Sequence, residues 1–356
     1  MAARLEGIAC LAGIAPWKRR RVTAMLSASG KLPHARDAAQ ALALAQMHGG
    51  AVACWNSRQP RGLPELAAQA GVPVWSVEDG FIRSAGLGAA LVQPCSLVLD
   101  SRSAHYDSTR PSDLEMLLEG GAFAPAQMER AARLIERLCA RRITKYNLGE
   151  SVPELPQDKP FALVLGQVDD DLSVQLGGAG QSVARMIETV RREEAGRTIV
   201  FKPHPDVSAG LRRGVAAPEG CIAVPDADLL WLIQRAERVH VLTSLGGFEA
   251  LLRGREVVVH GQPFYAGWGL THDRNPPLRR TRRLSLEALA AGALIEYPLY
   301  FDPAQGQRCT VEQLLDRIEA APPARPLSTL SRLRGQAALR LADLKRAAQF
   351  TRTPRP

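Results

Sequence analysis

Short apolar runs and longer helical patterns alternate repeatedly along this chain, and this alternation limits the folds that it can adopt. In the second half, four runs rich in Val, Ile and Leu occur at 161–166 (FALVLG), 198–204 (TIVFKPH), 238–243 (RVHVLT) and 256–261 (EVVVHG), and a helical pattern separates each from the next. Buried strands joined by helical crossovers are typical of parallel sheets covered on both faces. We therefore predict an α/β fold.

The first half shows the same alternation. Three apolar runs, AVACW, VPVWSV and CSLVLD, alternate with or precede helical patterns. In the helical segment at 111–121, Ser112 is the predicted N-cap and Glu115 occupies the capping-box position. This half is therefore expected to form a second parallel sheet with helices on its faces.

Residues 152–160 (VPELPQDKP) contain three prolines and no periodicity, which predicts a linker. We predict two Rossmann-like domains, 1–151 and 161–300, that face each other across a cleft, followed by C-terminal helices and a basic tail at 301–356. In open α/β sheets, ligands bind at the carboxyl ends of the strands. The segments that follow the predicted strands are therefore the candidate site.

The composition excludes several classes of protein. The six cysteines are far apart and lack Cys/His ligand spacing, which predicts reduced thiols and no metal site. No apolar run reaches the roughly 18–20 residues of a transmembrane helix. The N-terminal stretch is apolar first and basic after, the reverse of a secretory signal. We expect a cytoplasmic protein.

The net charge of +9 is concentrated near the two ends, in WKRRR (17–21) and from Ser331 onward. Few aromatic residues accompany it and no nucleic-acid-binding module is recognisable, so nucleic acid is not an expected partner. In the tail (331–356), Leu and Ala recur at helical spacing with Arg and Lys between them. Two interpretations stay open: a helix on an anionic membrane surface, or a solvated terminal helix.

Three consecutive carboxylates, Asp169, Asp170 and Asp171, directly follow the strand predicted at 161–166. Like charges this close disfavour one another, so a specific reason for them is expected. One interpretation is the N-cap of the next helix, where Asp is favoured. The other is a catalytic carboxylate at the end of a strand.

His204 lies between two prolines, which fix the backbone angles on either side of it. Lys202 and Asp206 flank it. A structural and a functional interpretation of this histidine are equally open.

The segment TSLGGFEALLRG (243–254) starts a helix that Thr243 or Ser244 can cap. Gly246 and Gly247 in its first turn would let a phosphate approach free N–H groups, although ordinary capping explains the same residues. Glu249, one turn further, is either a ribose or base contact or a solvent-facing residue.

Two loops complete the candidate site. In GQPFYAGWGLTHD (261–273), the three aromatic residues either pack in the core or line a pocket for a base or sugar; they are Phe264, Tyr265 and Trp268. In SVEDGFIRSAGLG (76–88), acidic and basic side chains occur among three glycines. Together these segments suit transfer of a group from a phosphate ester.

Several segments of this sequence strongly resemble those of the KpsC-type capsule polysaccharide proteins, which are bacterial β-Kdo transferases. The resemblance rests on EDGFIRSAGLG, HYDSTRPSDLE, KYNLG (145–149), GQVDDDLSV, FKPHPDV, TSLGGFEALLRG and GQPFYAGWGLT, in order from about Trp75 to Tyr300. Proteins of this type usually carry two transferase modules in tandem. This chain has one, which looks closer to the C-terminal module.

The resemblance implies a GT-B-like fold, with 1–151 on the acceptor side and 161–300 as the CMP-sugar donor domain. It implies CMP-Kdo as donor, with no cofactor and no metal, and a Kdo-primed glycolipid on the inner-membrane surface as acceptor. The β-(2→7) linkage would be made with retention through a glycosyl-aspartate. Capsule-assembly proteins would be further partners of a cytoplasmic protein peripheral to the inner membrane.

Carried over by motif, Asp171 falls on the nucleophile and His204, with Lys202, on the CMP phosphate site. Glu78 is the assigned acid/base partner. The other implied donor-binding residues are Gln167, Pro205, Thr243, Ser244, Gly246, Glu249, Tyr265 and Trp268, and the acceptor-side residues are Asp79, Arg83 and Ser84.

Two departures from the family pattern affect this assignment. Asn56 stands where a glycine is common, and VDDD replaces a Glu-Asp-Asp run, so register alone selects Asp171. Two other functions stay open: an inverting transferase for a related CMP-activated acid sugar, and a non-catalytic glycolipid-binding partner in capsule assembly.

Overall fold

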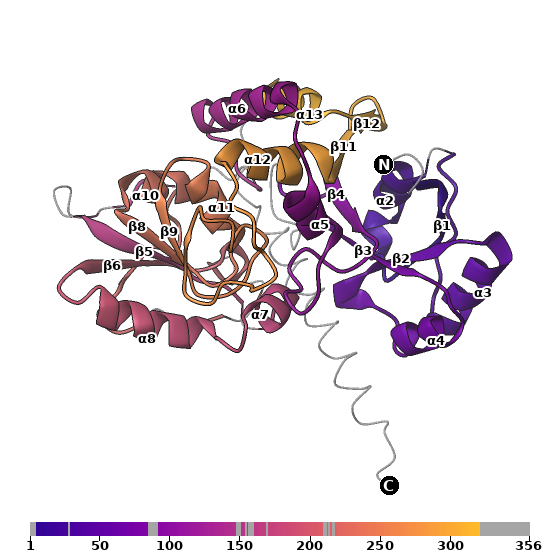
Figure 1. Ribbon diagram of the computed structural model, residues 1–356, viewed down its shortest axis with the longest axis horizontal. Helices are drawn as coiled ribbons and strands as arrows, with labels where there is room; N and C mark the ends of the chain where they lie inside the picture. Colours follow the sequence, from indigo (N-terminus) through magenta and orange to yellow (C-terminus); the bar gives the residue numbers. More distant parts are fainter. Residues whose placement is uncertain are drawn as a thin grey trace, which may run out of the picture.

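The computed structural model contains two α/β lobes side by side (Figure 1). It describes residues 5–320 except 28, 85–91, 147–150, 154, 156–159, 169, 209–211, 213 and 216–217. The predicted tail helix and most of the predicted linker therefore lie outside the described residues, as does Asp169. The α/β prediction is confirmed.

The second lobe contains the parallel sheet that the apolar runs predict. Its strands lie in the order β10-β9-β8-β5-β6-β7, and every pair is parallel. Their bounds are Phe161–Leu165 for β5, Thr198–Lys202 for β6, Ile222–Ala223 for β7, Arg238–Val241 for β8, Glu256–Val259 for β9 and His272–Asp273 for β10. Strand order reverses beside β5, and ligands bind at such switch points in open α/β sheets.

Helices cover both faces of this sheet. On one face, α8 (Val183–Glu193) packs its apolar side on β5 and β6, around Val164 and Phe201. On the other face lie α10 (Leu229–Arg235) and α11 (Leu245–Leu251). Two short helices, α7 (Leu172–Gly177) and α9 (Pro205–Ser208), are the next helices along the chain after β5 and β6.

The first lobe has a mixed sheet in the order β1-β2-β3-β4-β11-β12. The bounds are Ile8–Ala12 for β1, Ala51–Trp55 for β2, Val74–Asp79 for β3, Ser96–Asp100 for β4, Pro298–Asp302 for β11 and Gln307–Cys309 for β12. In this sheet the β1–β2 and β2–β3 pairs are parallel and the other three pairs are antiparallel, so the prediction of a fully parallel sheet is wrong here. No helix is described between β3 and β4, and antiparallel neighbours need no helical crossover.

Helices also cover this sheet on both faces. The segment η1 (Pro16–Lys18) leads into α2 (Arg19–Leu26), which packs on one face. On the other face lie α3 (Ala38–His48) and α4 (Leu63–Gln69), whose small alanines allow close approach to the strands. A 3-10 turn, η2 (Asn56–Arg58), follows β2.

The chain returns to the first lobe at its end. After the second sheet, α12 (Leu286–Ala290) and the π-helical turn η4 (Ala291–Glu296) lead into β11, which pairs with β4. Helices α6 (Pro125–Ala140) and α13 (Val311–Ala320) lie above the two lobes in Figure 1. Residues 298–300, which we assigned to the second domain, thus belong to the first sheet. One apolar core runs through both lobes, from Leu114 to Leu163 and Leu289.

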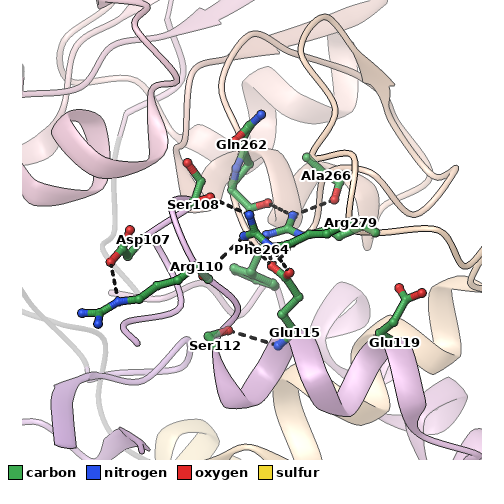
Figure 2. A network of polar contacts seen from close by, with 12 residues as sticks. Asp107, Ser108, Arg110, Ser112, Glu115, Glu119, Gln262, Phe264, Ala266 and Arg279 are labelled. Atoms are coloured by element: carbon green, nitrogen blue, oxygen red, sulfur yellow. Dashed lines mark hydrogen bonds and ion pairs between the residues drawn. The ribbon is translucent and has the colours of Figure 1, made fainter. Parts of the chain in front are cut away.

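Helix α5 (Asp113–Gly120) begins as the sequence predicts, because the Ser112 hydroxyl accepts a hydrogen bond from the Glu115 N–H at 3.1 Å. The Glu115 carboxylate does not complete the capping box. It pairs instead with Arg279 and Arg280, 164 and 165 residues further along the chain (Figure 2). The capping-box prediction is therefore only half right.

We call Glu115, Arg279 and Arg280 the inter-lobe network. Arg279 donates to the carbonyl of Ser108 at 2.7 Å, and Arg280 donates to the carbonyl oxygens of Pro263 and Ala266 at 2.6 and 2.7 Å (Figure 2). The network joins α5 to two loops, 104–110 and 262–268, each of which reaches the cleft described next.

Candidate active site

A cleft of about 650 Å³ lies between the lobes, at the carboxyl ends of β3, β5, β6 and β8. Residues from both lobes line it, as the two-domain prediction requires. The predicted site residues that line it are Glu78, Asp79, Gln167, Asp171, Lys202, His204, Pro205, Thr243, Ser244, Gly246 and Glu249. The fold therefore brings the segments that follow the strands of both lobes together in one cleft, as the sequence predicts.

Asp171 is itself the N-cap of α7, with its carboxylate accepting from the Ser173 N–H at 3.3 Å. The preceding Asp170 does not cap this helix and pairs with Arg212 at 2.6 Å instead. The Asp171 side chain stays 41% exposed, and its second oxygen lies 3.6 Å from Arg212. Capping thus orients this carboxylate at the cleft without covering it.

Glu78 and Asp79 are the last two residues of β3, and their surroundings affect the pKa of the two carboxyl groups in opposite directions. Burial raises the pKa of Glu78 to about 7, against a hydrogen bond that the Tyr106 hydroxyl donates at 2.8 Å. Burial also acts to raise the pKa of Asp79, but the cations Lys18, Arg83 and Lys145 outweigh it and lower that pKa. Separated pKa values on adjacent carboxyls are characteristic of acid/base sites. Glu78 can take up or release a proton near neutral pH, while Asp79 stays charged.

The hydrogen bond to Glu78 belongs to a connected set of four side chains, Ser76, Asn56, Tyr106 and Glu78. The Asn56 amide donates to the Ser76 hydroxyl at 2.8 Å and to the Tyr106 oxygen at 3.2 Å, so the Tyr106 proton is directed to Glu78. The sequence patterns assign no site role to residues 105–113, and Asn56 stands out in them only as a departure from the family pattern. The sequence signal that could have identified Tyr106 is its position, because residues 105 and 106 follow the strand β4 closely.

The basic N-terminal cluster is partly structural. The Lys18 ammonium is buried, lies 3.6 Å from the centre of the Trp55 ring and 3.4 Å from Asp79. Arg21 lies over the ring of Phe301. This cluster therefore stabilises the first lobe and one wall of the cleft.

His204 ends up partly exposed at the cleft, with Nδ1 accepting from the Asp206 N–H at 3.1 Å. Burial lowers its pKa, although Asp206 and Asp171 act in the opposite direction. In the neutral ring, the proton is then on Nε2, which is available as a donor. Nearby, the buried Lys202 ammonium donates to the carbonyl of Pro225 at 3.3 Å.

At the switch point, β5 and β8 are joined by a reciprocal pair of hydrogen bonds. The Gln167 amide accepts from the Thr243 N–H and donates to the Thr243 hydroxyl, both at 2.8 Å. Ser244 caps α11, so the capping interpretation holds. A Cβ on Gly246 would overlap Leu165, and one on Gly247 would overlap Tyr265. Close packing therefore requires these glycines.

Two aromatic residues predicted to bind the donor do not line the cleft. Tyr265 and Trp268 are fully buried, with Tyr265 donating to the Ser244 carbonyl and Trp268 donating to the Phe264 carbonyl at 2.8 Å. Phe264 is the aromatic residue of this loop that lines the cleft. The core-packing interpretation applies to Tyr265 and Trp268, since they hold the loop from behind.

The acceptor-side residues Arg83 and Ser84 are also buried behind the surface. Arg83 pairs with Asp79 at 2.8 Å and donates to the Ser84 hydroxyl at 2.7 Å. Of the three predicted acceptor-side residues, only Asp79 lines the cleft. Arg83 acts on the site through the charge of Asp79.

Glu249 is buried rather than solvent-facing, and its carboxylate accepts from the Lys145 N–H at 2.8 Å. Within the described ranges, no three His, Cys, Asp or Glu side chains are grouped as metal ligands. The prediction that no metal is needed stays a prediction.

Two Rossmann-like lobes with a charged cleft at the strand ends define a GT-B-like protein. The family described as "Capsule polysaccharide biosynthesis protein" matches residues 50–308, and this chain belongs to it. Residues 50–308 include the whole second sheet and part of the first lobe, and they contain every lining residue named above except Lys18. The KpsC-type resemblance is confirmed at the level of the family.

Two curated relatives are similar over most of the chain. The capsule polysaccharide modification protein LipA of Neisseria meningitidis serogroup B is 39% identical over 323 residues, which are 87% of this chain and 45% of LipA. The lipopolysaccharide-processing protein LpsZ of Rhizobium meliloti is 37% identical over 318 residues, 85% of this chain and 72% of LpsZ. This chain thus spans less than half the length of LipA.

Two solved structures of Thermosulfurimonas dismutans KpsC share the fold. Its β-Kdo 2,4 transferase has a TM-score of 0.77 and 29% identity, covering 88% of this chain and 98% of that one. Its β-Kdo 2,7 transferase has a TM-score of 0.71 and 33% identity, covering 87% and 97%. None of the described helices combines the length and apolar character that crossing a membrane requires.

Proposed function

We propose that this chain is a retaining β-Kdo transferase that moves Kdo from CMP-Kdo to a Kdo-primed glycolipid in capsule biosynthesis. The observation that carries the proposal is the cleft, which holds the Asp171 carboxylate from one lobe and a Glu78 of raised pKa from the other. The similarity to two Kdo transferase structures over nearly their full length supports it.

The first chemical step is attack of the Asp171 carboxylate on the anomeric carbon of Kdo. A carbon–oxygen bond to the aspartate forms as the bond to CMP breaks, and CMP leaves with the electron pair. Such a nucleophile must reach the sugar from the cleft. The partly exposed, capped carboxylate of Asp171 lines the cleft, which supports this step.

The second step regenerates the aspartate. An acceptor hydroxyl attacks the same carbon and gives its proton to Glu78, and the glycosyl-aspartate bond breaks. Two displacements at one carbon retain its configuration. A base with a pKa of about 7 is matched to this task at neutral pH.

On the donor side, the Nε2 proton of His204 and the Lys202 ammonium are the proposed phosphate contacts. Asp206 fixes the imidazole ring, so the donor nitrogen is pre-oriented. We propose that no resident metal takes part, so that chelation with EDTA leaves transfer unchanged. Loss of activity restored by a divalent cation would contradict this.

The acceptor linkage is proposed as β-(2→7). The higher sequence identity is to the 2,7 transferase, whereas the higher TM-score is to the 2,4 transferase. We give the sequence identity more weight than the TM-score, because the choice of acceptor hydroxyl depends on side chains. Sequence identity compares side chains, whereas the TM-score compares backbone positions. Linkage analysis of the product decides between the two.

The sharpest test is mass spectrometry of the protein with CMP-Kdo and no acceptor. The mechanism predicts a Kdo adduct on Asp171, and Asp171→Asn is expected to lose at least about a thousandfold in kcat. Asp170→Asn is the matched control, because that carboxylate pairs with Arg212 and is more exposed. Normal turnover of Asp171→Asn would exclude the glycosyl-aspartate route.

A further inference from the structure

Lys145 is held by both lobes at the edge of the cleft. Its N–H donates to the Glu249 carboxylate on α11 at 2.8 Å. Its carbonyl accepts from the N–H groups of Arg83 and Ser84, just after β3, at 3.0 and 3.3 Å. Hydrogen bonds to both lobes therefore fix the backbone of Lys145, and this fixes the position of its Cα, from which the side chain extends.

The Lys145 ammonium differs from the other two lysines that line the cleft. Lys18 is paired with Asp79, and Lys202 donates to a backbone carbonyl. Within the described part of the chain, no carboxylate lies within 4.0 Å of the Lys145 ammonium, and its one ring contact is Tyr146, 5.4 Å away. Among the described side chains, this ammonium therefore has no ion-pair partner, although it lines the cleft.

The charges around Lys145 explain why a cation is needed there. Burial acts to lower its pKa, whereas Tyr146, Asp79 and Asp171 raise it, and the net direction is upward. Its charge also lowers the pKa of both His105 and His204 on the cleft walls. A donor bearing a phosphate and a carboxylate would otherwise enter beside Asp79 and Asp171, where like charges repel.

We propose that the Lys145 ammonium binds an anionic oxygen group of the donor next to the reacting carbon, and that Glu249 positions it. The inference rests on the proposed function. The group has two sources, the carboxylate of the acidic sugar or the phosphate of the nucleotide. In both cases Glu249 acts through Lys145 rather than by touching the nucleotide.

The test compares Lys145→Met with wild type in two binding measurements and one rate. Calorimetry gives Kd for CMP and for CMP-Kdo without acceptor, and kcat/KM is measured with acceptor. We expect a loss of about 10- to 150-fold, as for one charge-assisted hydrogen bond. A loss for CMP-Kdo alone assigns the carboxylate, and an equal loss for CMP assigns the phosphate.

Three further variants keep the result interpretable. Lys145→Arg should recover most of the affinity, because it keeps the charge. The exposed Lys31→Met should match wild type in every assay. Glu249→Leu alone should weaken CMP-Kdo binding. Combined with Lys145→Met, it should weaken binding little further than Lys145→Met does alone. Unchanged binding and rate in a folded Lys145→Met would overturn the proposal.

Failure of this inference can be told apart from failure of the proposed function. A wild-type protein that binds CMP-Kdo without transferring it would contradict the transferase assignment. The two binding measurements would still decide the role of Lys145. A wild-type protein that binds neither ligand overturns both.

Discussion

Replacing Tyr106 by Phe removes the one hydrogen bond described between Glu78 and another side chain, the 2.8 Å contact from the Tyr106 hydroxyl. Because that bond stabilises the charged carboxylate, its loss raises the pKa of Glu78 further above about 7. A hydrogen bond to a charged group contributes roughly 1.5–3 kcal/mol, and one pKa unit corresponds to about 1.4 kcal/mol. We therefore expect an upward shift of about 1–2 units.

The assay is kcat/KM for the acceptor as a function of pH, at saturating donor. If Glu78 is the base, it must be deprotonated, and the acidic limb of the profile follows its pKa. In Tyr106→Phe this limb should move up by about 1–2 units, which lowers the rate at pH 7 about 5- to 50-fold. At high pH the two profiles should converge.

Tyr146→Phe is the matched control. Tyr146 also lines the cleft, but its hydroxyl has no described hydrogen bond to Glu78, so the acidic limb should stay in place. An equal loss of rate at every pH in Tyr106→Phe would show a purely structural effect. An unshifted limb would refute the assignment of Glu78 as the base.

Two further perturbations test other parts of the molecule. Glu115→Gln leaves Arg280, whose side chain is 3% exposed, without its counter-charge, and should lower the free energy of unfolding by about 3–5 kcal/mol in denaturant titrations. Glu119→Gln on the same helix, at an exposed contact with Thr281, should cost less than about 1 kcal/mol; equal effects would remove the argument for the inter-lobe network. Deleting residues 331–356 should weaken sedimentation with anionic vesicles but not with neutral ones, and unchanged binding would exclude the tail as a membrane contact.

Local patterns in the sequence predicted the second lobe well. The runs that contain Val164 and Val239 become central strands of a parallel sheet, and Ser112 and Ser244 cap helices as expected. These features depend on which residues within a few positions are apolar or can accept a hydrogen bond. Such information is contained in a short window of sequence.

The site was predicted from the same kind of information, and only in part. Strand ends identified the segments that contain Glu78, Asp171 and His204, because parallel strands place their carboxyl ends at one edge. The resemblance to the family then selected Asp171 within its triplet. The same reasoning could not separate Phe264, which lines the cleft, from Tyr265, which is buried behind it. Neighbouring side chains in a loop point in different directions. The amino-acid composition of the loop does not indicate which of them points into the cleft.

Local sequence patterns are sufficient for the class of fold, the capped helices and the neighbourhood of the reacting groups, since each follows from local periodicity and local hydrogen bonding. Long-range folding is what brings β11 back to the first sheet, pairs Glu115 with an arginine 165 residues away, and brings Tyr106 and Lys145 to the cleft. These contacts join distant parts of the chain. Their partners are selected by burial and charge in the folded molecule, which no short segment contains.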